Sequence, residues 1–89
     1  MTSRTTGGFW KLYDALPEHV QRRAKAAYQR FQQDPFHPGL QFKQVHETQP
    51  IYSARISRDY RAVGVRDNTE IIWFWIGSHS DYDNLLSQL

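Results

Sequence analysis

The sequence predicts a single α+β domain in which an N-terminal helical hairpin packs on a four-stranded antiparallel sheet, followed by a short C-terminal helix. Three observations predict this fold class. Apolar residues recur at helical spacing in the first third of the chain, β-branched and aromatic segments with short links follow, and helical spacing returns near residue 80. The 89 residues suffice for one core but not two, because domains below roughly 40 residues usually need crosslinks or partners to fold.

Two helices are predicted near the N-terminus. Residues 1–8 show no periodicity and end in two glycines, so we expect a flexible tail that precedes the domain at 9–89. Apolar residues then fall at i, i+3, i+4 and i+7 over residues 9–16, which predicts a short amphipathic helix. Pro17 ends it and suits the first turn of a longer helix over about residues 18–33.

Four strands are predicted after the prolines that end the second helix. Their links contain only two to four residues, which allows hairpins alone, since parallel neighbours need a crossover of about a dozen residues. The strands therefore form an antiparallel meander. The predicted strands cover residues 40–46, 51–57, 60–66 and 70–77.

The strand over residues 70–77 is predicted to lie inside the sheet. It is apolar on both faces, and at an edge it would invite intermolecular pairing. The helical hairpin can cover one face, and a C-terminal helix beginning around Ser80 can cover part of the other, with a partner protein as a candidate for the rest. On strict alternation, one face carries Ile71, Trp73 and Trp75. The other face carries Ile72, Phe74 and Ile76.

The composition excludes several classes of protein. The chain contains no cysteine, which excludes disulfides, thiolate zinc sites and a cysteine nucleophile. The longest apolar run, residues 71–76, is far shorter than the roughly 20 residues of a membrane helix, and no apolar signal segment opens the sequence. We therefore expect a cytoplasmic protein with no membrane partner.

Charge is unevenly distributed along the chain. Residues 1–66 contain all eleven Lys and Arg and five acidic residues, for a net charge of +6, whereas residues 67–89 carry −4. Such asymmetry is compatible with a basic surface that binds nucleic acid, and equally with a solvated helix face.

Arg55 and Arg61 form the first candidate site. Alternation along the strand 51–57 puts Arg55 on its less buried face. A strict two-residue turn at Arg58-Asp59 would put Arg61 on the opposite face, whereas a bulged or odd-length turn would put it beside Arg55. Two guanidinium groups on one face would bind phosphate strongly. The alternative is that Arg55 and Arg61 are ordinary surface residues of a hairpin with no ligand.

His79 is the second candidate. It lies between the most buried strand and the start of a helix, where a rigidly held imidazole can exchange a proton near neutral pH. Asp81 and Asp83 are typical helix-start residues, and a metal site built from these three groups is disfavoured because they diverge on a turning helix. Of the other histidines, His46 could approach the same groove, and His19 is expected to face solvent.

The chain contains the motifs Asp34-Pro35-x-His37-Pro38, Leu40-Gln-Phe-Lys43, Ile51-Tyr52-Ser53-Ala54-Arg55, Asp59-Tyr60-Arg61-Ala62 and Trp73 to Tyr82. In combination they resemble the RelE/ParE superfamily of bacterial type II toxin–antitoxin systems. The resemblance covers nearly the whole chain from about residue 9 and implies a RelE/ParE-like α+β fold. Its most specific part is the combination of Tyr60-Arg61 with Gly77-x-His79.

The resemblance implies a toxin that inhibits translation by cleaving mRNA on the ribosome, without a metal or other cofactor, and that a cognate antitoxin protein neutralises. The 2′-hydroxyl of the RNA attacks the adjacent phosphate, so the protein supplies a base, an acid and a cationic clamp. By this mapping His79 is the general acid, Asp59 is the base or orients it, and Arg55 and Arg61 clamp the phosphate. The expected RNA-binding residues are Lys43, His46, Arg58 and Tyr82.

Two other activities stay open. One is inhibition of DNA gyrase, as in ParE-like toxins, and the other is partner binding by a catalytically degenerate member. The sequence departs from the family in having no Lys beside Arg55 on its strand and in having Asp83 where YafQ-like members have an aromatic residue. The Asp83 carboxylate either points away into the helix or weakens RNA binding by repelling phosphate.

Overall fold

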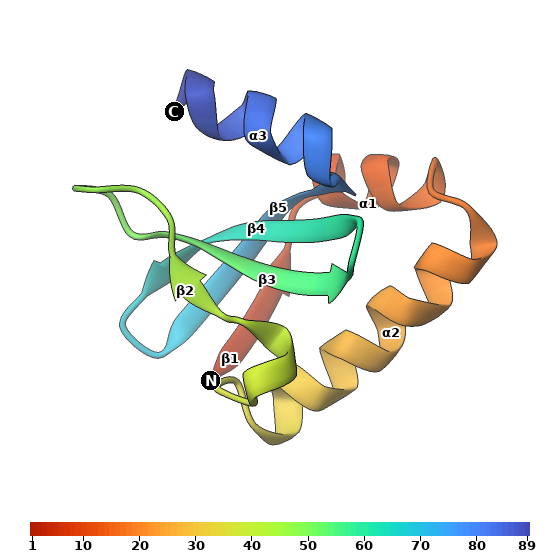
Figure 1. Cartoon of the computed structure of the whole chain (residues 1–89). Helices are drawn as coiled ribbons and strands as arrows, with labels where there is room; N and C mark the ends of the chain where they lie inside the picture. Colours follow the sequence, from red (N-terminus) through yellow and green to blue (C-terminus); the bar gives the residue numbers. More distant parts are fainter.

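A five-stranded mixed sheet forms the centre of the computed structural model, which describes residues 1–89. The strands are β1 (Thr2–Thr5), β2 (Lys43–Gln44), β3 (Ile51–Ser57), β4 (Tyr60–Asp67) and β5 (Glu70–Ser78), in the order β1-β5-β4-β3-β2. The helices are α1 (Gly7–Asp14), α2 (Glu18–Gln33) and α3 (His79–Gln88), with a 3-10 turn, η1, at Pro38–Leu40. Helices α1 and α2 cover one face of the sheet and α3 covers the other (Figure 1). None of the helices has the length and hydrophobicity needed to cross a membrane.

The N-terminal segment is an edge strand, so the predicted flexible tail over residues 1–8 is wrong. β1 pairs in parallel with β5, from Thr2 opposite Glu70 to Thr5 opposite Trp73. The indole nitrogen of Trp73 also donates a hydrogen bond to Ser3 Oγ at 2.9 Å. β1 contains no apolar residue, so the hydrophobic pattern gave no signal for it. Its pairing makes the sheet five-stranded and mixed instead of four-stranded and antiparallel.

The helices form close to the predicted positions, and side-chain caps set the starts of α1 and α3. α2 has the predicted limits, and α1 begins at Gly7, two residues earlier than expected, because Thr6 Oγ1 accepts a hydrogen bond from the Phe9 N–H at 3.1 Å. α3 begins at His79 because the capping residue is Ser78, whose Oγ accepts from the Asp81 N–H at 3.2 Å. The prediction that Ser80 opens this helix was therefore wrong by about one residue.

The predicted strand over residues 40–46 is much shorter than expected. Leu40 belongs to η1, and Gln41 adopts a left-handed backbone conformation with φ of 46°. Both features interrupt extended backbone, so only the two residues of β2 pair with β3. The predictions for β3, β4 and β5 agree with the structure to within one residue.

β5 lies inside the sheet as predicted, but a β-bulge breaks its alternation. Val63 of β4 pairs with Trp75 and Gly64 pairs with Trp73, which leaves Phe74 as an extra residue. The bulge moves Ile76 to the face of Trp73, under α1 and α2, whereas Trp75 packs in the smaller cluster under α3. Strict alternation had assigned Ile76 to the face of Phe74 and Trp75 to the face of Trp73, so both assignments were wrong.

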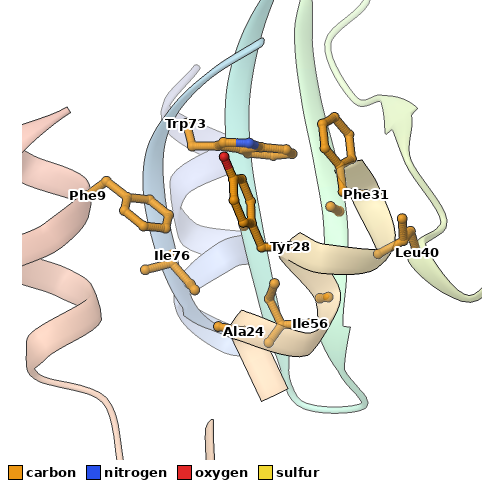
Figure 2. Close-up of a pocket in the computed structure, with 11 residues that line it drawn as sticks. Phe9, Ala24, Tyr28, Phe31, Leu40, Ile56, Trp73 and Ile76 are labelled. Carbon is orange, nitrogen blue, oxygen red and sulfur yellow. The ribbon is translucent and has the colours of Figure 1, made fainter. Parts of the chain in front are cut away.

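The two helices of the predicted hairpin lie over different parts of the sheet, with α1 on β5 and α2 on β3. Between them remains an apolar pocket of about 50 Å³ (Figure 2). Phe9, Tyr28 and Trp73 are among its lining residues, all of which are hydrophobic or aromatic. The pocket therefore offers packing surface and no charged group for phosphate binding.

Candidate active site

The predicted catalytic residues gather at one end of the sheet, where the β3–β4 turn meets the start of α3. Arg55 of β3 lies opposite Arg61 of β4, and Arg61 lies opposite Gly77 of β5. His79 follows two residues later, and its backbone N–H donates to the Asp59 carbonyl at 2.7 Å. The strand pairing thus brings two guanidinium-bearing residues, one carboxylate-bearing residue and one imidazole-bearing residue to the same end of the sheet.

A second bulge puts Arg55 and Arg61 on the same face. The register passes from Arg55 opposite Arg61 to Ser57 opposite Tyr60, so Ile56 has no partner. Of the two turn geometries that the sequence left open, the bulged one is adopted. Directly opposed residues of an antiparallel pair have Cβ atoms roughly 4.5–5.5 Å apart, so the two arginine side chains start as close neighbours.

Arg61 is anchored to the turn by its guanidinium. Its Nη1 donates to the carbonyls of Ser57 at 2.6 Å, Tyr60 at 2.9 Å and Arg58 at 3.3 Å. These carbonyls belong to the β3–β4 turn and to the strand residues that flank it. All three contacts use one nitrogen, and the guanidinium has further N–H donors on Nε and Nη2. Arg61 therefore stabilises the turn and retains donors for an anion.

His79 forms an ion-pair contact with Asp83, one helical turn later. The Nδ1 atom lies 3.3 Å from Asp83 Oδ2, and the two side chains are 49% and 63% exposed. The Tyr82 ring packs edge-on against the imidazole, with centroids 5.7 Å apart. The contact with Asp83 uses Nδ1, so Nε2 is the ring nitrogen left for proton exchange with a ligand.

Sequence reasoning missed this role of Asp83. The carboxylate turns back along α3 toward His79. The signal was the i, i+4 spacing of a histidine and an aspartate in a predicted helix, which brings two side chains to the same helix surface.

Asp59 lines a cleft beside the β3–β4 turn. Its side chain is exposed and lines a space of about 210 Å³ together with His19, Arg23 and Arg58. Its contact with His79 runs through the backbone carbonyl, so Asp83 and not Asp59 orients the imidazole. His19 is exposed as expected, but its position in the cleft beside Asp59 was not foreseen. No group of three or more His, Asp or Glu side chains converges as a metal site would require.

Tyr82 and His46 occupy positions that do not support the RNA contacts predicted for them. Tyr82 is only 8% exposed, and its hydroxyl donates to Ser53 Oγ at 3.2 Å inside the smaller core cluster. His46 Nε2 lies 3.1 Å from the carbonyl oxygen of Leu89, at the far end of α3 from His79. Ten residues of helix span about 15 Å, so His46 is remote from the candidate site.

Lys43 and Arg58, the other two predicted RNA-binding residues, are exposed. Lys43 lies opposite Ser53 on β3, two residues before Arg55 on the same face of that strand. Arg58 is part of the β3–β4 turn itself. Both side chains are therefore available to a ligand that approaches this end of the sheet.

Comparison with known proteins relates both the sequence and the fold to toxins. Residues 18–84 match the family model described as the ParE-like toxin domain. No curated protein matches the sequence. Among solved structures, the RelB–RelE antitoxin–toxin complex from Methanococcus jannaschii is similar, with a TM-score of 0.75, 17% identity, and 92% of this chain and 96% of that chain covered.

Two further structures have the same fold. YafQ from E. coli strain BL21(DE3) has a TM-score of 0.71 at 9% identity, with 90% of this chain and 94% of that chain covered. The toxin–antitoxin complex RelBE2 from Mycobacterium tuberculosis has a TM-score of 0.69 at 18% identity, with 88% and 96% covered. At these identities the similarity is one of fold.

Proposed function

Because the chain belongs to the ParE-like toxin domain family, we propose that it is the toxin of a type II toxin–antitoxin pair and cleaves mRNA on the ribosome without a metal ion. The observation that carries this proposal is the end of the sheet at which His79, held by Asp83, lies near the opposed residues Arg55 and Arg61. This set supplies an acid and a cationic clamp within a few residues of an exposed carboxylate, Asp59.

In the proposed reaction, the 2′-oxygen of one ribonucleotide forms a bond to its 3′-phosphorus while the bond from phosphorus to the next 5′-oxygen breaks. Asp59 accepts the proton of the 2′-hydroxyl, and His79 donates a proton from Nε2 to the departing 5′-oxygen. Arg55 and Arg61 bind the non-bridging oxygens, whose negative charge increases in the transition state. The products are a 2′,3′-cyclic phosphate and a free 5′-hydroxyl.

Asp83 acts in this scheme through His79. The carboxylate 3.3 Å from Nδ1 holds the ring so that Nε2 is left for the substrate. Asp83 is therefore a positioning residue. Its charge faces the histidine, which limits its repulsion of the RNA backbone.

The proposed partner is an antitoxin protein, together with the ribosome and its mRNA in the cytoplasm. Two of the similar structures are complexes of a toxin with its antitoxin, which supports the first of these partners.

Induced expression in a bacterium, with mapping of mRNA 5′ ends, tests the proposal. Growth arrest should come with new 5′ ends inside translated messages, and His79→Ala should remove both effects. Ser80→Ala, one residue further along the same exposed start of α3, serves as the control and should retain both. Growth arrest by the unmodified chain without new 5′ ends would reject the nuclease.

The match to a ParE-like model favours gyrase inhibition as the second candidate. A supercoiling assay with purified chain and gyrase distinguishes the two activities. Loss of supercoiling with unaltered mRNA ends would replace the nuclease proposal, and a chain inactive in both assays would be a degenerate member that only binds its partner.

A further inference from the structure

A groove lined by four arginines runs between α2 and β3, two elements that pack side by side (Figure 1). Its volume is about 430 Å³. Arg23 and Arg30 come from α2, and Arg55 and Arg58 come from β3 and its turn. No aspartate or glutamate lines it. The remaining lining residues are small or aliphatic, namely Ala26, Ala27, Gly39, Leu40, Ile56 and Ser57.

None of these four arginines is paired with a carboxylate. The ion pairs of the chain join Arg4 to Glu70, Arg22 to Glu18 and His79 to Asp83, all outside the groove. Arginines on both sides of one groove raise the local positive potential and repel one another, so a bound anion is favoured. Arginine binds phosphate with paired donors and stays charged, which makes phosphate a well-matched ligand.

The length of the groove indicates a ligand with several anionic groups. Arg23 and Arg30 are seven residues apart in α2, which puts them two turns apart on one face of the helix, about 10.5 Å along its axis. A single phosphate cannot bridge that distance. The small side chains of Ala26, Ala27 and Gly39 between the arginines leave room for an extended chain.

The groove also leads to the candidate active site. It shares Arg23, Ser57 and Arg58 with the cleft that contains Asp59. The Asp59 carbonyl in turn accepts the hydrogen bond from the backbone of His79. An extended anionic chain lying in the groove would thus continue toward the proposed acid and base.

We propose that this groove binds the sugar–phosphate backbone of single-stranded RNA on one side of the cleavage point, with Arg23 and Arg30 as phosphate contacts. The identity of the ligand as RNA rests on the proposed function, whereas its anionic character rests on the arginines themselves. The contacts are to phosphate, so they favour no base sequence. Their role is to hold the strand on the toxin beyond the reacting phosphate.

Fluorescence anisotropy of a labelled 12-nucleotide oligouridine, titrated with the His79→Ala chain at several salt concentrations, tests this inference. Replacing Arg23 and Arg30 together by Gln should weaken binding by at least about tenfold at 100 mM salt. The slope of log K against log salt should fall by about 1.4, since each lost phosphate contact on a single strand removes about 0.7. Arg22→Gln is the matched control, because Arg22 lies on the same helix, is paired with Glu18 and is absent from the groove; it should bind RNA as the parent does.

Two results would overturn the inference. One is equal affinity and equal salt slope in the parent and the doubly substituted chain, both shown to be folded by circular dichroism. The other is an oligoglutamate peptide of equal charge that competes as well as oligouridine, which would assign the groove to an acidic protein segment. Because binding is measured without ribosomes and in the His79→Ala chain, a failure of RNA binding and a failure of mRNA cleavage are separate results.

Discussion

His79 is the residue on which the proposed chemistry depends most. A positioned proton donor contributes about 10² to 10⁴-fold to a rate, so His79→Ala should lower mRNA cleavage by that factor. The side chain is about half exposed, so stability should change little. Cleavage of a defined message on purified ribosomes measures the first effect, and thermal unfolding measures the second. Cleavage at the parent rate would exclude His79 as the acid.

Asp83 should have a much smaller effect than His79. Ion pairs between exposed groups contribute less than about 1 kcal/mol, so Asp83→Asn should slow cleavage by less than about fivefold. Asp81→Asn, two residues earlier on the same helix and also exposed, is the control and should leave the rate unchanged. Equal rates in the two variants and the parent would show that the contact with His79 does not act in the reaction.

At the scale of single residues, the sequence predicted only part of the candidate site. Arg55, Asp59, Arg61 and His79 were all chosen from the sequence, and the strand pairing brings them to one end of the sheet. The face occupied by Arg61 was not predictable, because a one-residue bulge reverses it and no residue pattern specifies that bulge. The two groove arginines of α2, Arg23 and Arg30, were missed because helix periodicity shows which residues are exposed, but not which other element they face.

At the scale of elements, the bulge in β5 depends on Gly64. A Cβ at this position would lie 2.8 Å from the Ile72 carbonyl oxygen and 3.0 Å from the Trp73 ring. Gly64→Ala should therefore lower the free energy of unfolding by roughly 1–3 kcal/mol through overpacking, as measured by urea denaturation. Gly7→Ala is the control, because a Cβ there meets nothing within 4 Å. A Gly64→Ala chain as stable as the Gly7→Ala chain would contradict this account of the bulge.

Elements with a strong residue pattern were predicted well, and those formed by pairing alone were not. The 16 residues of α2 show clear apolar periodicity, and β5 shows a long apolar run. β1 contains only polar residues, and its stability comes from hydrogen bonds to a strand far away in the sequence. The bulge opposite Gly64 likewise reflects the packing of two helices against one sheet, which a single strand does not reveal.

At the scale of the whole molecule, β1 closes the sheet beside its most apolar strand. Removing residues 1–5 should expose the backbone edge of β5 and favour intermolecular pairing. We expect a lower unfolding temperature and soluble aggregates in size-exclusion chromatography. Arg4→Ala removes only an exposed ion pair with Glu70 and should cost less than about 1 kcal/mol. A monomeric truncated chain with the parent's unfolding temperature would show that β1 does not protect this edge.

The parallel pairing of β1 with β5 also bears on when the protein becomes active during its own synthesis. Thr2 pairs with Glu70, so β1 can pair only after β5 has been synthesised, although β1 precedes the other strands in the chain. His79 is made later still, and contacts between such distant segments form slowly. A nascent chain therefore lacks both the finished sheet and the proposed proton donor while most of its codons are being read. On the proposed function, the chain that a ribosome is making therefore cannot act on that ribosome until translation has passed residue 79.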